Sequence, residues 1–98
     1  MKKYRTSGKS DRDITDIYKY TAVHFGFAQA GHYLEGLYQL FSRLGDNPGI
    51  GRSFTISRKT YRRFEYESHV IFYKKRAKDI LIVRVLHQRM DAKRHLGM

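Results

Sequence analysis

The sequence has no cysteine, only one proline among its 98 residues, and no apolar run near the roughly 20 residues that cross a bilayer. Without cysteine the chain can form no disulfide, no thiolate metal site and no cysteine nucleophile. The opening residues, MKKYRTSGKSDRD, also lack the apolar core of a signal peptide. These absences predict a cytoplasmic protein with no membrane partner, whose stability comes from packing.

Acidic residues are scarce as well, since 9 Asp and Glu stand against 20 Lys and Arg and leave a formal net charge of +11. Such a charge attracts polyanions, whether DNA, RNA, the ribosome or an acidic protein segment, and it cannot choose among them. A basic surface kept for solubility is the plainer alternative. The hydrophobic content of 41% is too high for a disordered chain, so we expect residues 1–98 to form one compact domain.

Two helices are expected in the first half of the chain, after a short strand over residues 4–7 and a break at Gly8 and Lys9. Ser10 is a candidate N-cap, because its hydroxyl can accept a hydrogen bond from the backbone three residues on. The pattern predicts a first helix over residues 11–24, ended by Gly26, and a second over about 30–44, closed by Gly45. The apolar positions at helical spacing are Ile14, Ile17, Tyr18, Thr21 and Phe25, then Ala30, Tyr33, Leu34, Leu37, Tyr38, Phe41 and Leu44.

The period of the apolar residues changes after a concentrated turn signal at residues 46–49. Residues 61–66, 69–73 and 80–86 are rich in aromatic and β-branched side chains and predict an antiparallel meander of three strands. The run from Ile80 to Val83 is apolar without alternation, which favours a central strand buried on both faces. Asp91 can cap a short final helix. The predicted class is α+β, with an N-terminal strand, an antiparallel helix hairpin packed on a small curved antiparallel sheet, and a short C-terminal helix.

Four sequence blocks in the second half resemble one known family. They are His69-Val70-Ile71-Phe72-Tyr73, Ile80-Leu81-Ile82-Val83-Arg84-Val85-Leu86-His87, Arg89-Met90-Asp91 and Arg94-His95-Leu96. Their order and spacing closely resemble the ParE branch of the RelE/ParE toxin superfamily. The first half adds Asp13-Ile14-x-x-Ile17-x-x-Tyr20, Ala30-x-x-Tyr33 and Asn47-Pro48-x-x-Gly51-Arg52. The resemblance covers the chain from Tyr4 to Leu96.

The resemblance implies the fold that the periodicity predicts, and it also implies a function. Toxins of the ParE branch act on DNA gyrase and stall it on cleaved DNA. Each is held inactive by a ParD-like antitoxin, which is disordered at its toxin-binding end and carries a ribbon-helix-helix end for operator DNA. The toxin would then contact DNA only indirectly, through gyrase or through the antitoxin. This chain departs from the family at Ser10, where Ala is usual, and over residues 53–60, which match no block.

The sister RelE branch, which cleaves mRNA on the ribosome, provides the alternative function. On paper Glu65, Arg84 and His87 could supply the proton transfers and the cation that RNA cleavage requires. Related nucleases carry R-L-V-Y where this chain has residues 70–73, Val-Ile-Phe-Tyr, so an arginine is replaced by valine. This replacement favours a non-enzymatic inhibitor. A nucleic-acid-binding module that stacks bases on Tyr61, Phe64, Tyr66 and Tyr73 is a third hypothesis, although strand core explains those aromatics more simply.

No histidine pair shows the spacing of a zinc site together with a carboxylate or thiol, so we assign no metal, no cofactor and no catalytic residue. The polar residues within the strands have a structural interpretation. Arg84 would form a buried ion pair with Glu65 or Asp91, and His69 would make a hydrogen bond in the core. Their functional interpretation is a basic surface that meets the target.

Two sets of residues are candidates for binding. The basic end of the chain can converge on one surface and is expected to contact gyrase. Its members are Tyr73, Arg84, His87, Arg89, Arg94 and His95. The second set consists of aromatics on the helix hairpin that cannot all point inward, and that suit an acidic amphipathic antitoxin segment. These are Tyr20, Phe27, Tyr33 and Tyr38.

Overall fold

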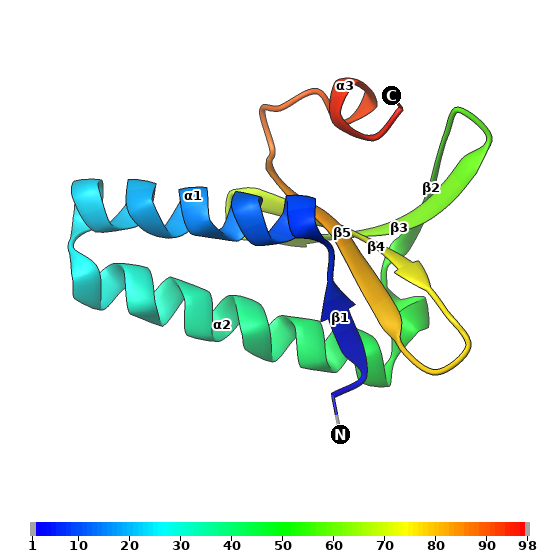
Figure 1. The fold of residues 1–98 in the computed structure, drawn as a ribbon, viewed down its shortest axis with the longest axis horizontal. Helices are drawn as coiled ribbons and strands as arrows, with labels where there is room; N and C mark the ends of the chain where they lie inside the picture. The colour runs from blue at the N-terminus through cyan, green and yellow to red at the C-terminus, as the bar shows by residue number, and fades with distance from the viewer. Residues whose placement is uncertain (1, 98) are drawn as a thin grey trace.

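A helix hairpin packs on one face of a five-stranded sheet, and a short third helix packs on the opposite face (Figure 1). The computed structural model describes residues 2–97. The strand order is β1-β5-β4-β3-β2, with β1 parallel to β5 and the other neighbours antiparallel. The elements are β1 (Tyr4–Thr6), α1 (Gly8–Phe25), α2 (Phe27–Asp46), the 3-10 helix η1 (Pro48–Ile50), β2 (Arg52–Ile56), β3 (Lys59–Tyr66), β4 (His69–Lys75), β5 (Ile80–His87) and α3 (Ala92–Leu96). The predicted α+β class is confirmed. Within residues 2–97, no helix is both long and apolar enough to span a membrane.

The first helix begins earlier than the sequence predicts. Ser7, in extended conformation at the end of β1, caps α1 by accepting a hydrogen bond from the Ser10 backbone at 3.0 Å. The predicted N-cap, Ser10, lies inside the first turn, where it is fully buried and its hydroxyl donates to the Ser7 carbonyl at 2.9 Å. The predicted cap at Ser10 and the predicted break at Gly8 and Lys9 are therefore wrong. A strand leads directly into a helix with no loop between them.

Two glycines shape the hairpin in different ways. Gly26 ends α1, as predicted, and joins the helices at a φ of 90°, a conformation that favours glycine. Gly45 does not close α2, which continues to Asp46 with Asn47 as its C-cap. A Cβ on Gly45 would lie 2.7 Å from the Lys3 carbonyl oxygen. The glycine at position 45 therefore serves close packing of α2 against the N-terminal segment, and not helix termination.

The meander has four strands, because the sequence analysis missed β2. Most of β2 is exposed at the sheet edge, and its polar residues show little alternation of buried and exposed positions. The turn from β2 to β3 also lacks a recognisable signal. Its residues Ser57 and Arg58 both adopt positive φ, at 50° and 65°, where Asn and Gly are usual. The other three predicted strands are confirmed.

Alternation along the strands divides the apolar residues between two clusters. The larger cluster lies between the sheet and the hairpin and includes Ile14, Ile17, Leu37, Phe41, Leu44, Ile71, Tyr73, Ile80, Ile82 and Val85. The smaller cluster lies on the other face, under α3, and consists of Ile56, Tyr61, Val70, Phe72, Leu86 and Leu96, with Phe54, Val83 and Ala92 against it. The sheet is therefore covered broadly on one face and by a single short helix on the other.

The edge of β5 is completed partly by α1. The strand β1 pairs only with residues 80–82, which leaves the following backbone groups of β5 without a strand neighbour on that side. Ser7 donates to the carbonyls of Ile82 and Val83 at 3.0 and 2.8 Å, and the Asp13 carboxylate accepts from the Val85 backbone at 3.0 Å. The start of the hairpin thus satisfies groups that an open sheet edge would expose.

Candidate functional site

Arg84 joins the hairpin to the sheet. Its guanidinium donates two hydrogen bonds to the Asp13 carboxylate, at 2.8 and 2.9 Å, and both side chains are only 14% exposed. The bidentate contact raises the pKa of Arg84. The predicted buried ion pair exists, but its partner is Asp13 of α1, whereas Glu65 and Asp91 were expected. Because this guanidinium is used internally, little of Arg84 is left for a partner protein.

Tyr73 belongs to the core. Its side chain is fully buried, and its hydroxyl accepts from the Gly51 backbone at 2.9 Å and donates to the Pro48 carbonyl at 2.8 Å. Burial raises the pKa of the Tyr73 hydroxyl. Tyr73 therefore anchors the segment that leads from η1 into β2, and the prediction that it contacts a target is wrong.

His69 sits in a half-buried network between the sheet and α2. The Tyr33 hydroxyl lies 2.6 Å from Nδ1 of His69, and the rings of His69 and His87, which face each other across β4 and β5, have centroids 5.4 Å apart. Burial lowers the pKa of His69, and the neighbouring His87 lowers it further. Burial also raises the pKa of Tyr33 to about 12. The predicted hydrogen bond of His69 is confirmed, and Tyr33 faces the sheet.

The tail after β5 presents three cations to solvent, Arg89, Lys93 and Arg94. Asp91 caps α3 by accepting from the Lys93 backbone at 3.0 Å, as predicted, and Leu96 anchors the helix on the smaller core cluster. Arg89 and Arg94 are exposed, whereas His87 and His95 are half-buried. Of the six target candidates, the structure therefore leaves these two arginines most accessible.

The hairpin extends beyond the sheet, so no other element of residues 2–97 packs over the end that carries the α1–α2 turn (Figure 1). Four bulky apolar side chains lie there with 62% to 80% of their surface exposed. These residues, Tyr20, Val23, Phe25 and Phe27, are called the hairpin tip below. Two of them are predicted antitoxin contacts. Tyr38, another candidate, is 39% exposed but packs edge-on against Phe41, away from the tip.

Sequence reasoning missed half of the tip. Val23 was not singled out, and Phe25 was placed in the core stripe of the first helix because it fits the helical period. The structure exposes 67% of Phe25, so that assignment is wrong. A signal was available, because two phenylalanines directly flank Gly26, where the chain reverses direction. Residues beside the turn of a long hairpin have no sheet beneath them.

Positive charge is concentrated on the sheet and the tail. Residues 8–46, which form the hairpin, contain four basic residues (Lys and Arg) and five acidic residues (Asp and Glu). Residues 52–97 contain thirteen basic and four acidic residues. The formal net charges are therefore −1 and +9. The overall charge of +11 suggests that an acidic segment is attracted to the hairpin aromatics. The hairpin itself has no net positive charge that could attract it.

The residues considered for RNA cleavage do not converge. Glu65 pairs with Val70, which pairs with Leu86, so these three side chains share one face of the sheet. His87 follows Leu86 and faces the other side, and Arg84 is bound to Asp13.

Among residues 2–97 no group of three or more His, Cys, Asp or Glu is placed to hold a metal ion. The aromatics proposed for base stacking are largely core, since Tyr61 and Tyr73 are buried and Phe64 and Tyr66 pack under the hairpin.

A basic α+β domain with a helix hairpin on a curved sheet and a short tail on the opposite face defines the RelE/ParE-like class. Comparison with known families places the chain within it. The family described as the ParE toxin of the type II toxin–antitoxin system parDE matches residues 4–92. The chain therefore belongs to the ParE family of toxins from type II toxin–antitoxin systems.

Similar proteins agree with this assignment over nearly the whole chain. Toxin ParE1 of Caulobacter vibrioides is 38% identical over 97 residues, which cover 99% of this chain and all of that protein. Toxin ParE1 of Mycobacterium tuberculosis strain H37Rv is 36% identical over 95 residues, 96% and 97% of the two chains. Among solved structures, a chain of the chromosomal ParDE TA system from P. aeruginosa superposes with a TM-score of 0.73 at 21% identity. That superposition covers 89% of this chain and 96% of the other, and it shows a shared fold.

Proposed function

We propose that this toxin inhibits DNA gyrase by binding it, without acting as an enzyme, and that a ParD-like antitoxin neutralises it. The observation that carries the proposal is the match of residues 4–92 to the ParE toxin family. The site geometry supports the non-enzymatic part. An RNA-cleaving centre needs its acid, base and cation on one side of the substrate phosphate, and Glu65 and His87 face opposite sides of the sheet.

The tail is the proposed contact for gyrase. Arg89 and Arg94 are exposed cations on either side of the Asp91 cap, and α3 is held on the sheet through Leu96. A cation held on a docked helix loses less conformational entropy on binding than one on a mobile tail. His95 of α3 is a half-buried member of the same surface, whereas His87 faces His69 on the hairpin side of the sheet. Arg84 contacts α3, because one of its guanidinium nitrogens donates to the His95 carbonyl oxygen at 3.5 Å.

The hairpin tip is the proposed contact for the antitoxin. Exposed aromatic and aliphatic side chains at one end of a hairpin suit the apolar face of an amphipathic segment that folds on binding. Tyr20 and Phe27 are the principal contacts, and the stacking of His24 on Tyr20, with centroids 4.1 Å apart, restrains that ring. Tyr38 lies further along α2 and would extend the same contact. The antitoxin's own DNA-binding end would carry the complex to its operator.

A supercoiling assay tests the proposed target. Purified toxin added to gyrase, relaxed plasmid and ATP should abolish supercoiling and leave linear DNA trapped with the enzyme. Normal supercoiling with the toxin in excess would refute the proposal. The same preparation added to programmed ribosomes should leave the mRNA intact, whereas cleavage in the ribosomal A site would assign the chain to the RelE-like alternative.

Co-expression tests the proposed antitoxin. The product of the small open reading frame adjacent to the toxin gene should form a stable, stoichiometric complex with the toxin and restore growth. Tyr20→Ala combined with Phe27→Ala should weaken that complex, while Tyr33→Phe, a change at a residue that faces the sheet, should leave it intact. Toxicity that the neighbouring product does not affect, with no co-purification, would refute this part of the proposal.

A further inference from the structure

The sheet face turned away from the hairpin, here called the open face, carries cations set over aromatic rings. Lys74 Nζ of β4 lies 5.0 Å from the centroid of the Tyr61 ring, and Arg63 Cζ of β3 lies 5.8 Å from that of Phe54. Phe54 and Tyr61 are cross-strand partners, so the two rings are neighbours on this face. A cation over a ring is held in position with its charged end toward solvent. The open face therefore presents two fixed positive charges.

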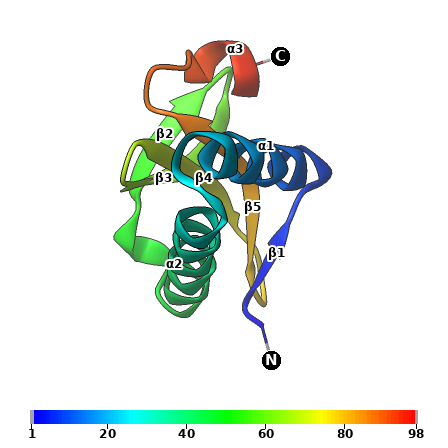
Figure 2. The same cartoon turned by 90° about the vertical axis from the view of Figure 1, so that its left-hand side faces the viewer.

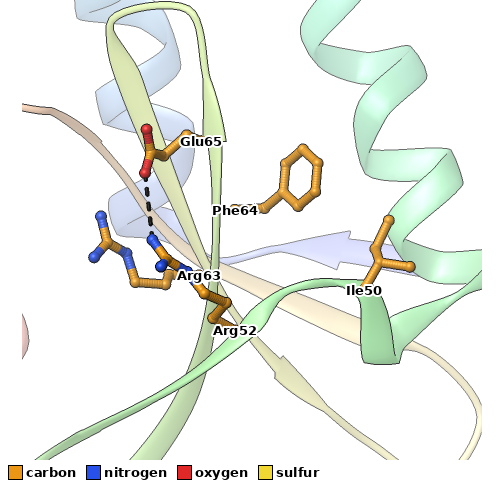
Figure 3. Close-up of a pocket in the computed structure, with 5 residues that line it drawn as sticks. All are labelled: Ile50, Arg52, Arg63, Phe64 and Glu65. Atoms are coloured by element: carbon orange, nitrogen blue, oxygen red, sulfur yellow. Dashed lines mark hydrogen bonds and ion pairs between the residues drawn. The ribbon is translucent and has the colours of Figure 1, made fainter.

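Arg63 has a donor that nothing in the described chain satisfies. Its Nε is buried, and it has no hydrogen-bond partner within residues 2–97. A buried N–H of a charged group without an acceptor is costly. The Glu65 carboxylate nearby instead contacts Arg52 at 3.5 Å, in a pair that is largely exposed (Figure 3). Figure 3 also shows Phe64 and Ile50 on the opposite side of β3 from the Arg63 guanidinium.

The positive surface continues from the open face to the β2–β3 turn and α3. The Ser57 hydroxyl at this turn donates to the Gly97 carbonyl at 3.4 Å, and Leu96 packs in the same cluster as Ile56. Figures 1 and 2 both show α3 beside the end of the β2–β3 hairpin. Four exposed cations therefore gather at this end of the molecule, namely Arg58, Lys59, Lys93 and Arg94. The nearby Asp91 carboxylate is engaged in capping α3.

We propose that the open face and its continuation over the β2–β3 turn and α3 bind the phosphate backbone of double-stranded DNA directly. The inference rests on the proposed function, in which the toxin acts where gyrase holds DNA, and it replaces the expectation that the toxin meets DNA only indirectly. The cations come from two strands, a turn and a helix, a spread that suits successive phosphates.

The chemistry of this surface favours duplex backbone over the other polyanions. Single strands bind by stacking bases on exposed aromatic rings, but Tyr61 and Phe72 are only 4% and 2% exposed. An amphipathic acidic peptide needs an apolar surface for its other face, and the apolar residues here lie beneath the cations and α3. What remains accessible is positive charge, which recognises phosphates without reading sequence.

Fluorescence anisotropy with a labelled duplex of arbitrary sequence, without gyrase or antitoxin, tests the proposal. The toxin should bind with an affinity that falls steeply as salt rises. Arg63→Gln with Lys74→Gln should weaken binding about tenfold or more, and should reduce the slope of log affinity against log salt by about 2, roughly one unit for each phosphate contact removed. Lys9→Gln with Lys19→Gln, an equal charge loss on the exposed surface of α1, is the matched control and should change both quantities little.

Three outcomes would overturn the proposal. They are an absence of duplex binding at low salt, an equal loss in both double variants, which would indicate net charge alone, and tighter binding of a polyglutamate chain of matched charge. Circular dichroism of each variant shows whether it has kept its fold. Gyrase inhibition is measured separately, so a toxin that inhibits gyrase without binding duplex would contradict the DNA contact and leave the proposed function in place.

Discussion

The hairpin and the sheet differ in both charge and exposed apolar surface. The hairpin, residues 8–46, has a formal net charge of −1 and carries four strongly exposed apolar side chains at its tip. The region of β2 to α3, residues 52–97, has a formal net charge of +9, and its apolar residues are largely buried. One small toxin therefore offers two surfaces of different chemistry, which suit two different partners.

The two regions are held together by few polar contacts, and Asp13 makes the strongest of them. Its carboxylate binds the Arg84 guanidinium twice and accepts from the Val85 backbone. Asp13→Ala would leave a mostly buried guanidinium and a backbone N–H without partners, so we expect a loss of about 3 kcal/mol in the free energy of unfolding. Chemical denaturation followed by circular dichroism measures the loss.

The matched control for this variant is Asp16→Ala, an exposed change on the same helix. It should alter the free energy of unfolding by less than about 0.5 kcal/mol. Equal, small effects of the two substitutions would show that the hairpin is held on the sheet by apolar packing alone.

Packing between α2 and β3 depends on the absence of a side chain at Gly36. A Cβ at this position would collide with the Tyr66 hydroxyl. Gly36→Ala should therefore destabilise the protein by about 1–3 kcal/mol through overpacking. At Gly31 an added Cβ would meet no atom of residues 2–97 within 4 Å apart from its chain neighbours and the nearby helix backbone. Gly31→Ala should instead stabilise the exposed helix by about 0.5–1 kcal/mol. The melting temperature of each variant measures the effect. A shift of the same sign in both variants would contradict this explanation.

The smallest expected effect is a pH dependence of stability at His69, which lies between the sheet and α2. Burial and the neighbouring His87 lower the pKa of His69 from its usual 6.5, so the unfolded chain binds a proton there more readily than the folded one. The stability contributed by neutral His69 is therefore present above about pH 6.5 and is lost as the pH falls through the folded-state pKa.

Urea denaturation midpoints at about pH 7.5 and about pH 5 measure this effect. The wild-type midpoint should fall with pH by more than that of His69→Gln, in which the group that titrates at this position is absent. The other histidines are present in both proteins, so the difference between the two profiles reports on position 69. Parallel profiles would show that this histidine does not couple pH to stability.

Local patterns in the sequence predicted most of the fold. The helical spacing of Ile14, Ile17, Leu37, Phe41 and Leu44 located the larger core, and β-branched and aromatic runs located three strands. The strand β2 was missed because only Phe54 and Ile56 pack against the smaller core cluster and the other three of its five residues are exposed, so its alternation is short. Its turn adopts positive φ at Ser57 and Arg58, which do not signal such a turn in a sequence.

The candidate site was harder to predict, because its geometry depends on contacts between distant residues. Arg84 was correctly expected in an ion pair, but its partner Asp13 is 71 residues away along the chain. Tyr73 and Phe25 show the same difficulty in opposite directions. Tyr73 lies in a block that resembles the ParE family and is fully buried, whereas Phe25 follows the core spacing and is exposed. Helical period cannot reveal that the hairpin extends past the sheet that would cover it.

Gyrase supercoiling with two double variants, each with and without antitoxin, tests the division between the two surfaces most directly. Tyr20→Ala with Phe27→Ala should inhibit gyrase like the wild type but should need far more antitoxin for neutralisation. Arg89→Glu with Arg94→Glu should still bind the antitoxin and melt near the wild-type temperature, yet should inhibit gyrase much less. If both variants lose both properties, or if inhibition survives reversal of both arginines, the proposed separation of antitoxin and gyrase surfaces is wrong.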